Sequence, residues 1–544
     1  MLEQFARLFN IRRDELRRLT IISIMMVFFI IGYVWANITI ISNFVSNLGT
    51  DKIPLLLIGD AVIIVITFAG YSAVADRWAN HHIMAGLAVL GIVGILLGIV
   101  LLRSGGTLFA GANAAGWTSF FLYLVFRSVG EAISTHWGPL VNDYFDTRAA
   151  KRIFTLLGGV VRLSYIVGAL SLAIFNDSAP ELILLGLSVW IVTLLGIFIM
   201  SVSMPRLMRV EAVQPIVQNT DSPKGYWQNL YEGYQFAFKS YYLRAFVVAS
   251  ILMMILLALM QFEVLAILDE TYTGADAERQ ISDFLSQITF WGSVVLLPFQ
   301  LFVFNRLVSW AGVETVNLVF PTTSLLAALA LATIPFLNPE IATFVIPLLG
   351  ITLVVGIAMI AEFNRTILNI GIRAINDEFL YNAVPVRVKG RTRGFISGIV
   401  EPFGTLLAGL IVSLPLITTN DLFVPVLLVG FAIAYLLSSL WVSRQYGRAL
   451  ISMIEEENFS FLLEANNQIA IDADTVQSLA KRFKQAQDND ARLLMARLLI
   501  EARGDYYLDL LLAHAENGSK YLRAGMIDSF VSADLRSPKV IDMC

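Results

Sequence analysis

Runs of about twenty apolar residues recur along most of this chain of 544 residues. An α-helix needs about 20 such residues to cross the hydrocarbon core of a bilayer. Charged residues make up only 15% of the chain, well below the roughly 25% of a soluble protein. The short alternating segments that are typical of membrane β-strands do not occur in the sequence. The chain is therefore predicted to be an all-α polytopic membrane protein.

About twelve spans are expected, six in each half of the chain. The first six are Leu19–Val45, Ile53–Val74, Ile83–Leu102, Gly111–Val141, Phe154–Phe175 and Leu182–Val202. The second six are Ala245–Leu268, Phe284–Val308, Val316–Leu337, Ile341–Ile372, Phe395–Ile417 and Leu422–Val442. The predicted domains are a basic amphipathic segment (1–18), a six-helix bundle (19–202), a linker (203–243), a second six-helix bundle (244–445) and a soluble helical region (446–544). Within the linker a surface helix is expected from Tyr226 to Lys239.

Lys and Arg residues indicate the orientation of the spans. With the N-terminus inside, roughly twenty basic residues fall on one side and about three, Lys52, Arg103 and Arg279, on the other. Both termini and the linker are therefore predicted to be cytoplasmic, in a bacterial inner membrane. The segment at 1–18 is expected to be a surface helix held by lipid phosphates.

Ionisable residues lie inside the spans in two related patterns. Glu131 precedes Asn142-Asp143 and Arg365 precedes Asn376-Asp377 at the same spacing, while Arg162 and Glu401 each follow a glycine by three residues in the next span. A chain whose halves repeat with charge at their interface is typical of transporters. The pattern predicts two pseudo-symmetric halves and a contact of Arg162 with Glu401 or Glu131.

Two of these charges have partners on the same predicted helix face, Arg127 with Glu131 and Glu362 with Arg365. Because an ionised group in lipid is costly, all of them are expected to face the bundle interior or water. They line a substrate or proton pathway, or they form interhelical ion pairs that hold the halves in register. Pro402 predicts a distortion of the helix at Glu401.

Other candidates are single residues. His136 is either a proton relay or a hydrogen-bonded cavity histidine, and Asp60 and Glu263 are proton or cation sites or buried hydrogen-bond partners. The polar stretch around Asn37 in the first span is expected to face a cavity. Four histidines and the single Cys544 favour neither a metal site nor a disulfide. No cofactor motif, enzyme motif or nucleic-acid-binding pattern occurs in the sequence.

The region after Arg448 is charged and helical by periodicity. Its stretch Ala491–Ala502 is echoed by Leu522–Ala533, which resembles short HEAT-type repeats. Repeats of this kind need neighbours to bury their apolar faces. The expectation is a region that regulates the bundle or recruits a protein partner, and a sequence that is a piece of a longer protein.

Asp76-Arg77 between the second and third spans, with its counterpart Asn305-Arg306 in the second half, is similar to a loop signature of the major facilitator superfamily. Asn142-Asp143 with Ala150–Phe154, and Arg391–Ile396 with Glu401–Gly404, resemble segments of the ATP:ADP antiporter family of nucleotide transporters. The resemblance implies a twelve-helix fold of the major facilitator type and a conformational role for the two loops. It also implies phosphate binding by basic residues, for which Arg127 and Arg162 are available.

The preferred hypothesis is a secondary transporter that works by alternating access around a charged midplane cavity. Its partners would be the lipid bilayer and a small organic anion or nucleotide-like solute. The alternative is a receptor or scaffold that does not transport, whose bundle presents the helical region. An occluded core with every charge paired would distinguish this second function.

Overall fold

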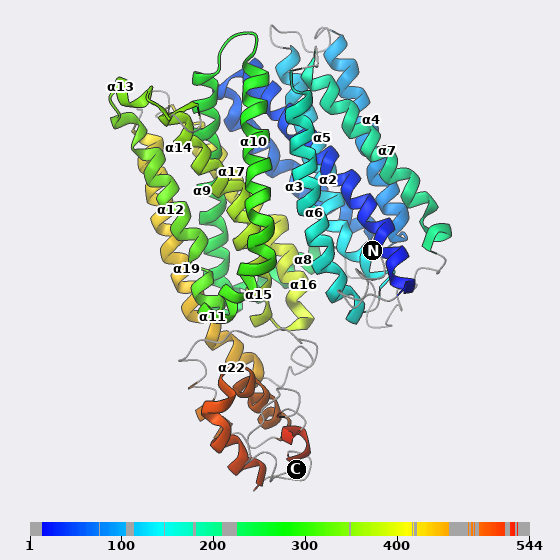
Figure 1. Cartoon of the computed structure of the whole chain (residues 1–544), viewed down its shortest axis with the longest axis vertical. Coiled ribbons are helices and arrows are strands. Elements are labelled where there is room, and N and C mark those ends of the chain that lie inside the picture. The colour runs from blue at the N-terminus through cyan, green and yellow to red at the C-terminus, as the bar shows by residue number, and fades with distance from the viewer. Residues whose placement is uncertain are drawn as a thin grey trace.

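The computed structural model places helices over nearly all of the chain that it describes (Figure 1). The described residues are 13–75, 77–104, 114–145, 147–177, 181–208, 226–346, 350–415, 417, 422–455 and, within 477–530, residues 477, 480–481, 483–484, 489–516, 523–527 and 530. In this part of the chain the β-structure is a pair of antiparallel strands of two residues each, β1 (Val345–Ile346) and β2 (Ile351–Thr352). The predicted all-α class is confirmed.

Six long helices form the N-terminal half, drawn in blue to teal in Figure 1. They are α2 (Arg13–Leu48), α3 (Ile53–Ala75), α4 (Asn80–Arg103), α5 (Ala114–Asn142), α6 (Thr147–Phe175) and α7 (Leu182–Met208), with the turn η1 (Thr50–Lys52) before α3. The linker contains α8 (Tyr226–Lys239), with the bounds that the sequence predicts.

The C-terminal half, green to yellow in Figure 1, also has six membrane-crossing units. They are α9 (Tyr241–Thr271); α10 (Ala277–Pro298) with η2 (Phe299–Phe304) and α11 (Asn305–Val316); α12 (Val319–Ala332) with η3 (Ile334–Phe336); α14 (Leu353–Glu362) with η4 (Phe363–Arg373), α15 (Ala374–Leu380) and η5 (Tyr381–Ala383); α16 (Val386–Phe395) with η6 (Ile396–Val400) and α17 (Glu401–Val412); and α19 (Phe423–Glu455). The short α13 (Pro339–Ala342) precedes the strands.

Eleven helices in the described part of the chain are long and apolar enough to cross a bilayer. To these we add α5, whose 29 residues carry Arg127, Glu131 and His136 and would rise about 43 Å at 1.5 Å per residue. Helix α5 packs against α2, α3 and α4 inside the first half. Its charged side chains lower its mean hydropathy, and Arg127 and Glu131 face a cavity between the helices rather than lipid. With α5 counted, the bundle has twelve spans.

Small residues let the helices of the first half approach closely. A side chain at Gly32 of α2 would lie 2.0 Å from the Thr193 hydroxyl of α7, and one at Gly186 of α7 would lie 2.2 Å from the Thr39 hydroxyl of α2. Such small-residue contacts replace the hydrophobic effect as the basis of packing in membranes. Away from these contacts, α4 exposes a stripe of large apolar side chains to the lipid, namely Val89, Leu90, Val93, Leu96, Leu97 and Val100.

The two ends of the bundle differ in charge. One end carries the start of α2, the loop around Arg77, and α8; we call this end the basic end. The opposite end carries the turn η1 and the loop from Tyr272 to Asp276. In Figure 1 the basic end is the lower one, where α11, α15 and α16 are labelled.

One predicted boundary is wrong and another is described only in part. Residues 13–18 belong to the same helix, α2, as the first span. The rest of the predicted surface helix, residues 1–12, lies outside the described residues, so its place at the membrane surface stays a prediction. The tenth span begins at Leu353 rather than Ile341, because apolar residues before it belong to α13 and to the strands β1 and β2, and Gly350, directly before β2, has a φ of 67°. That positive φ favours glycine and ends any helix there.

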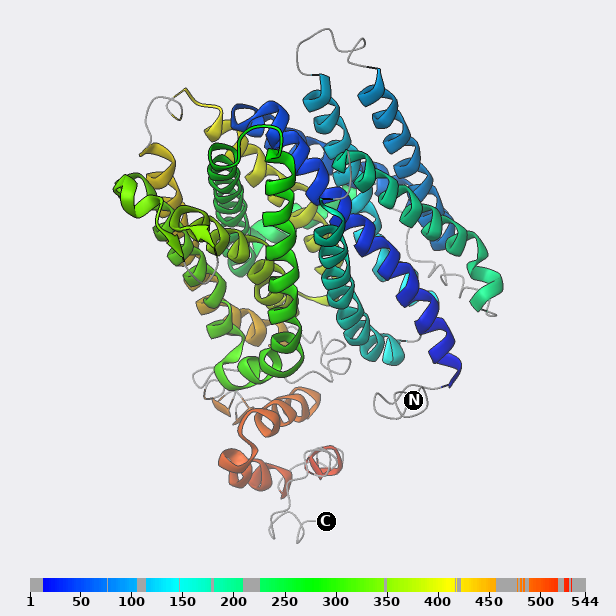
Figure 2. The same cartoon turned by 45° about the horizontal axis from the view of Figure 1, so that its top comes forward.

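The region after the bundle is described only in part. Helix α22 (Asn489–Glu516) lies below the membrane bundle in Figure 1, and the orange helices of Figure 2 show the same region. Its residues Met495, Leu499 and Leu511 are buried together with Phe483 and Phe530 in a small apolar core. A helical C-terminal region is therefore present, and its HEAT-type repeat stays a prediction.

Candidate functional site

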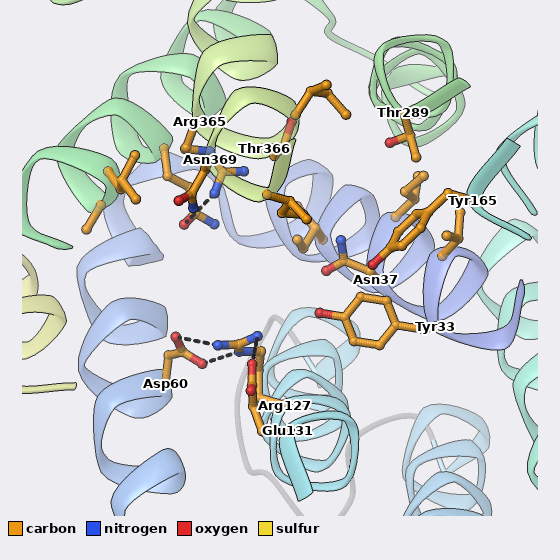
Figure 3. A pocket seen from close by; sticks show the side chains of 18 of the residues that line it. Tyr33, Asn37, Asp60, Arg127, Glu131, Tyr165, Thr289, Arg365, Thr366 and Asn369 are labelled. Atoms are coloured by element: carbon orange, nitrogen blue, oxygen red, sulfur yellow. Dashed lines mark hydrogen bonds and ion pairs between the residues drawn. The ribbon is translucent and has the colours of Figure 1, made fainter. Parts of the chain in front are cut away.

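A cavity of about 390 Å³ lies between the two halves of the bundle. Its lining comes from α2, α3, α5 and α6 of the first half and from α9, α10, η4 and α17 of the second. Figure 3 shows the charged and polar side chains of both halves around this space. Three arginines, Arg127, Arg162 and Arg365, and two carboxylates, Asp60 and Glu131, line it. The predicted charged cavity at the interface of the halves is present in the structure.

Arg127 is the centre of a cluster on the first half. Its Nε donates to Asp60 Oδ1 of α3 at 2.5 Å, and its Nη1 lies 2.8 Å from Glu131 Oε1 one turn along α5. The dashed lines in Figure 3 mark these contacts. The predicted Arg127–Glu131 pairing is thus observed, and Asp60, which the sequence left as an ion site or a hydrogen-bond partner, joins it across two helices. The cluster holds two carboxylates around one guanidinium.

The second half contributes a two-point ion pair. Arg365 Nη2 and Nε donate to Glu362 Oε1 and Oε2 at 2.7 and 2.9 Å, and Arg365 Nη1 lies 3.5 Å from Gln261 Oε1 of α9. Arg365 lies on η4, a π-helix, while Glu362 is buried behind it and does not line the cavity. A π-turn places an extra residue in the helix and often occurs at functional sites. Here η4 brings Arg365, Thr366 and Asn369 to the cavity.

Arg162 differs from the other two arginines of the cavity. It is 6% exposed, its Nε donates to Gln300 Oε1 at 3.0 Å, and its guanidinium lies 5.8 Å from the ring centre of Tyr165. Among the described residues no carboxylate forms an ion pair with it, whereas Arg127 and Arg365 are both paired. The predicted contact of Arg162 with Glu401 or Glu131 is therefore wrong. The bond to Gln300 joins the halves through a neutral amide and leaves the positive charge uncompensated.

Glu401 belongs to a third cluster, away from this cavity. Arg373 Nη2 lies 3.1 Å from Glu401 Oε1, and Arg373 Nε lies 2.8 Å from Asp377 Oδ2. The sequence contains this signal, because Arg373 and Asp377 have the same spacing as Arg127 and Glu131, but the prediction did not use it. The predicted distortion at Pro402 is confirmed, since the π-helix η6 ends directly before Glu401.

His136 and Glu263 do not line the cavity. His136 is fully buried, with its Nδ1 2.8 Å from the Tyr71 hydroxyl and its Nε2 2.7 Å from the Asn80 carbonyl oxygen. A histidine whose two nitrogens are bonded in this way joins α5 to α3 and α4. Glu263 is partly buried on α9.

Arg77, in the turn that follows α3, and Arg306, at the start of α11, are exposed. Asp76 and the side chain of Asn305 lie outside the described residues. The conformational role of this pair of loops stays a prediction.

Neutral polar groups complete the cavity. Tyr33, Asn37, Tyr165 and Thr289 point into the space that Figure 3 shows. The position of Asn37 confirms the prediction that the polar part of the first span faces a cavity. The tyrosines and Thr289 were not predicted, because these residue types are common on lipid-facing and buried surfaces alike. In the described part of the chain no three His, Cys, Asp or Glu residues are placed to hold a metal ion.

The halves are joined at the end opposite to the basic end. The backbone N–H of Thr50 donates to Asp269 Oδ2 at 3.0 Å, and Asn176 Nδ2 donates to the carbonyl oxygen of Arg279 at 3.1 Å. Near the same end α17 packs on α3 so closely that a side chain at Gly409 would lie 2.8 Å from Ile58 Cγ1 and 3.2 Å from its backbone N. These contacts close the space between the halves at that end.

No family model matches the chain. No curated protein matches it in sequence either. Solved structures do resemble it: a mutant of the nucleoside transporter NupG has a TM-score of 0.53 and 13% identity, with 79% of this chain and 99% of that chain covered. A POT family transporter in complex with 5-aminolevulinic acid has a TM-score of 0.55 and 12% identity, with 80% and 96% covered. Another, in complex with a thioalcohol-conjugated peptide, has a TM-score of 0.52 and 11% identity, with 80% and 96% covered.

Because the sequence identities are so low, this similarity shows the fold alone. The TM-scores and the twelve spans in two halves show that the membrane bundle of this chain has the predicted major-facilitator-like fold.

Proposed function

We propose that this protein is a secondary transporter that carries an organic anion by alternating access of its two halves around the central cavity. The observation on which this depends is Arg162, a buried guanidinium on the cavity wall with a neutral partner and no carboxylate among the described residues. Burying a charge without a counter-charge is costly. An anionic group of the solute would supply that counter-charge.

The remaining lining fits the body of such a solute. A volume of about 390 Å³ falls within the roughly 300–1,000 Å³ of small-molecule sites. Tyr33, Tyr123 and Tyr165 provide aromatic faces and hydroxyl groups, and Asn37 and Asn369 provide amides. A nucleotide-like anion, which the sequence resemblance implies, is one member of this class.

The alternative function, a receptor or scaffold that does not transport, needs an occluded core with all charges mutually paired. The open volume and the uncompensated Arg162 favour transport over this alternative. Under the proposal the basic end faces the cytoplasm of a bacterium, and the structure corresponds to a state closed toward the outside by the Thr50–Asp269 and Asn176–Arg279 contacts. The helical region around α22 would regulate transport or bind a protein partner.

The test is uptake of labelled solutes into proteoliposomes, with a panel of nucleotides, monocarboxylates, dicarboxylates and neutral nucleosides. We expect uptake of at least one anion by the unaltered protein, and loss of that uptake in Arg162→Ala. The control is Arg103→Ala, which removes an exposed guanidinium at the end of α4 far from the lining residues and leaves uptake unchanged. Uptake of neutral solutes only, or equal uptake by Arg162→Ala, would contradict the proposal.

A further inference from the structure

A second cavity, of about 450 Å³, lies at the basic end of the second half. Residues of α8, α9 and α19 and the segment around Pro385 surround it, with Phe236, Lys239, Ser240, Tyr241, Gln445 and Arg448 among them. None of its lining residues lines the central cavity. It is a separate site, and neither the sequence patterns nor the proposed transport pathway accounts for it.

Two cations converge on this cavity from different helices. Lys239 is the last residue of α8 and Arg448 lies near the end of α19; both are exposed. In the described part of the chain neither forms an ion pair with a carboxylate, although Arg391 and Glu232 pair nearby between α16 and α8. Two like charges at one hollow repel each other and attract an anion. The Gln445 amide and the Ser240 hydroxyl add neutral hydrogen-bonding groups.

The cavity lies at the level where the membrane spans end. One apolar span begins at Tyr241 and another ends at Leu450, beside Arg448. Around it Tyr241, 54% exposed, meets Trp441 edge to face at 5.5 Å, and the Arg244 guanidinium lies 4.9 Å from the Tyr241 ring centre. Aromatic rings and basic side chains gather in this way at the headgroup level of a bilayer. On α8 the aromatic residues Tyr231, Tyr234 and Phe238 are also exposed.

We propose that this cavity binds the phosphate headgroup of an anionic phospholipid of the inner leaflet, a step that rests on the proposed cytoplasmic orientation of the basic end. Lys239 and Arg448 contact the phosphate, and the apolar side chains of Phe236 and Leu243 lie against the glycerol and upper acyl carbons. A bound lipid joins α8, which precedes the second half, to α9 and α19 within it. Basic pockets between spans on the cytoplasmic side are a general form of lipid site.

The experiment uses the full chain, purified in neutral detergent and titrated with phosphatidylglycerol, phosphatidylcholine or inorganic phosphate, with retained lipid counted by native mass spectrometry. The test variant is Lys239→Gln with Arg448→Gln. Its matched control is Arg206→Gln with Arg444→Gln, which removes the same charge from exposed positions of α7 and α19 outside the cavity. A charge-keeping variant, Lys239→Arg with Arg448→Lys, guards against a folding defect.

We expect the unaltered protein to retain phosphatidylglycerol in preference to phosphatidylcholine. The test variant should bind it about thirtyfold more weakly, because each basic side chain near a lipid surface contributes roughly a fivefold factor. The control pair and the charge-keeping variant should bind as the unaltered protein does. Equal weakening in the test and control pairs would mean a diffuse attraction, and displacement of the lipid by inorganic phosphate would mean a soluble anion site; either result overturns the proposal. Neither outcome depends on solute uptake.

Discussion

Arginine residues in the core of this bundle meet three different environments. Arg127 and Arg373 each lie between two carboxylates, Arg365 is paired with one, and Arg162 has a glutamine as its partner. Because Arg127, Arg365 and Arg373 are already neutralised, they stabilise the fold whether or not a solute is present. Arg162 has no carboxylate partner among the described residues, so of these four arginines it would stabilise a bound anion most.

The first prediction concerns the partner of Arg162. Gln300→Glu places a carboxylate where the amide oxygen now lies, 3.0 Å from Arg162 Nε, and so pairs the guanidinium inside the protein. The KM for the transported anion should rise about tenfold to a hundredfold, which corresponds to the loss of one charge-assisted hydrogen bond. The measurement is the concentration dependence of uptake.

The matched control for this change is Gln261→Glu, which introduces the same carboxylate beside Arg365, an arginine that already has Glu362. A smaller effect there is expected. If both substitutions raised the KM equally, a general effect of negative charge in the cavity would be responsible and the special role of Arg162 would be lost.

A second prediction concerns the Asp60–Arg127–Glu131 cluster. Arg127→Leu leaves two carboxylates facing each other without a counter-charge, and should lower the free energy of unfolding by about 3 kcal/mol, as for other broken buried pairs. Adding Asp60→Asn removes one of these carboxylates and should restore part of the loss. Thermal unfolding in detergent measures both variants; an Arg127→Leu protein as stable as the original would contradict the assigned geometry.

At the scale of elements, part of the site was predictable and part was not. The spacing of Arg127 and Glu131 on one helix face is local, so the sequence contains it, as it contains the polar face around Asn37. The Arg162–Gln300 contact joins α6 to η2, and a glutamine inside an apolar span gives no sign of its partner. The opposite charges at matching positions of the two halves favoured Glu401 as the partner of Arg162. The partner of Glu401 is instead Arg373, from the adjoining span.

The bounds of elements show the same limit. The end of α8 at Lys239 was predictable from its amphipathic pattern. The start of the tenth span was not, because Ile341 and Phe344 are apolar in sequence yet lie exposed before α14 in α13 and the segment that follows it. Hydropathy does not separate an apolar turn at the membrane surface from the helix that follows it.

The third prediction belongs to the contact of α17 with α3. Gly409→Val places atoms against Ile58 and its backbone, where even a Cβ would lie 2.8 Å from the nearest carbon. The substitution should separate the halves at the end opposite to the basic end and open the cavity from that side. A cysteine at Thr289, which lines the cavity, in a Cys544→Ala background should then react several times faster with an impermeant thiol reagent added outside.

The control for this labelling is Gly430→Val in α19, where a side chain would meet nothing within 4 Å. Its labelling rate should equal that of the parent protein. If Gly409→Val also left the rate unchanged, the α3–α17 contact would not be part of the outer closure.

At the scale of the whole molecule, two six-helix halves enclose one charged space, and the closed contacts lie at one end of it. Interfaces of this kind have discrete open and closed arrangements, since packed helices do not deform continuously. A solute bound between the halves can then favour one arrangement over the other. This is the physical content of the alternating-access proposal, and the scaffold alternative lacks it.

The most direct test of that claim is a pair of distance measurements by pulsed electron paramagnetic resonance in the Cys544→Ala background. One pair of spin labels, at Ala79 and Ser309, reports on the basic end, and the other, at Asp51 and Thr273, on the opposite end; all four positions are exposed and each pair joins the two halves. When the transported anion is added, the two distances should change in opposite directions, one population lengthening as the other shortens. A single unchanged distribution at both ends, with the anion bound, would contradict transport by rocking of the halves.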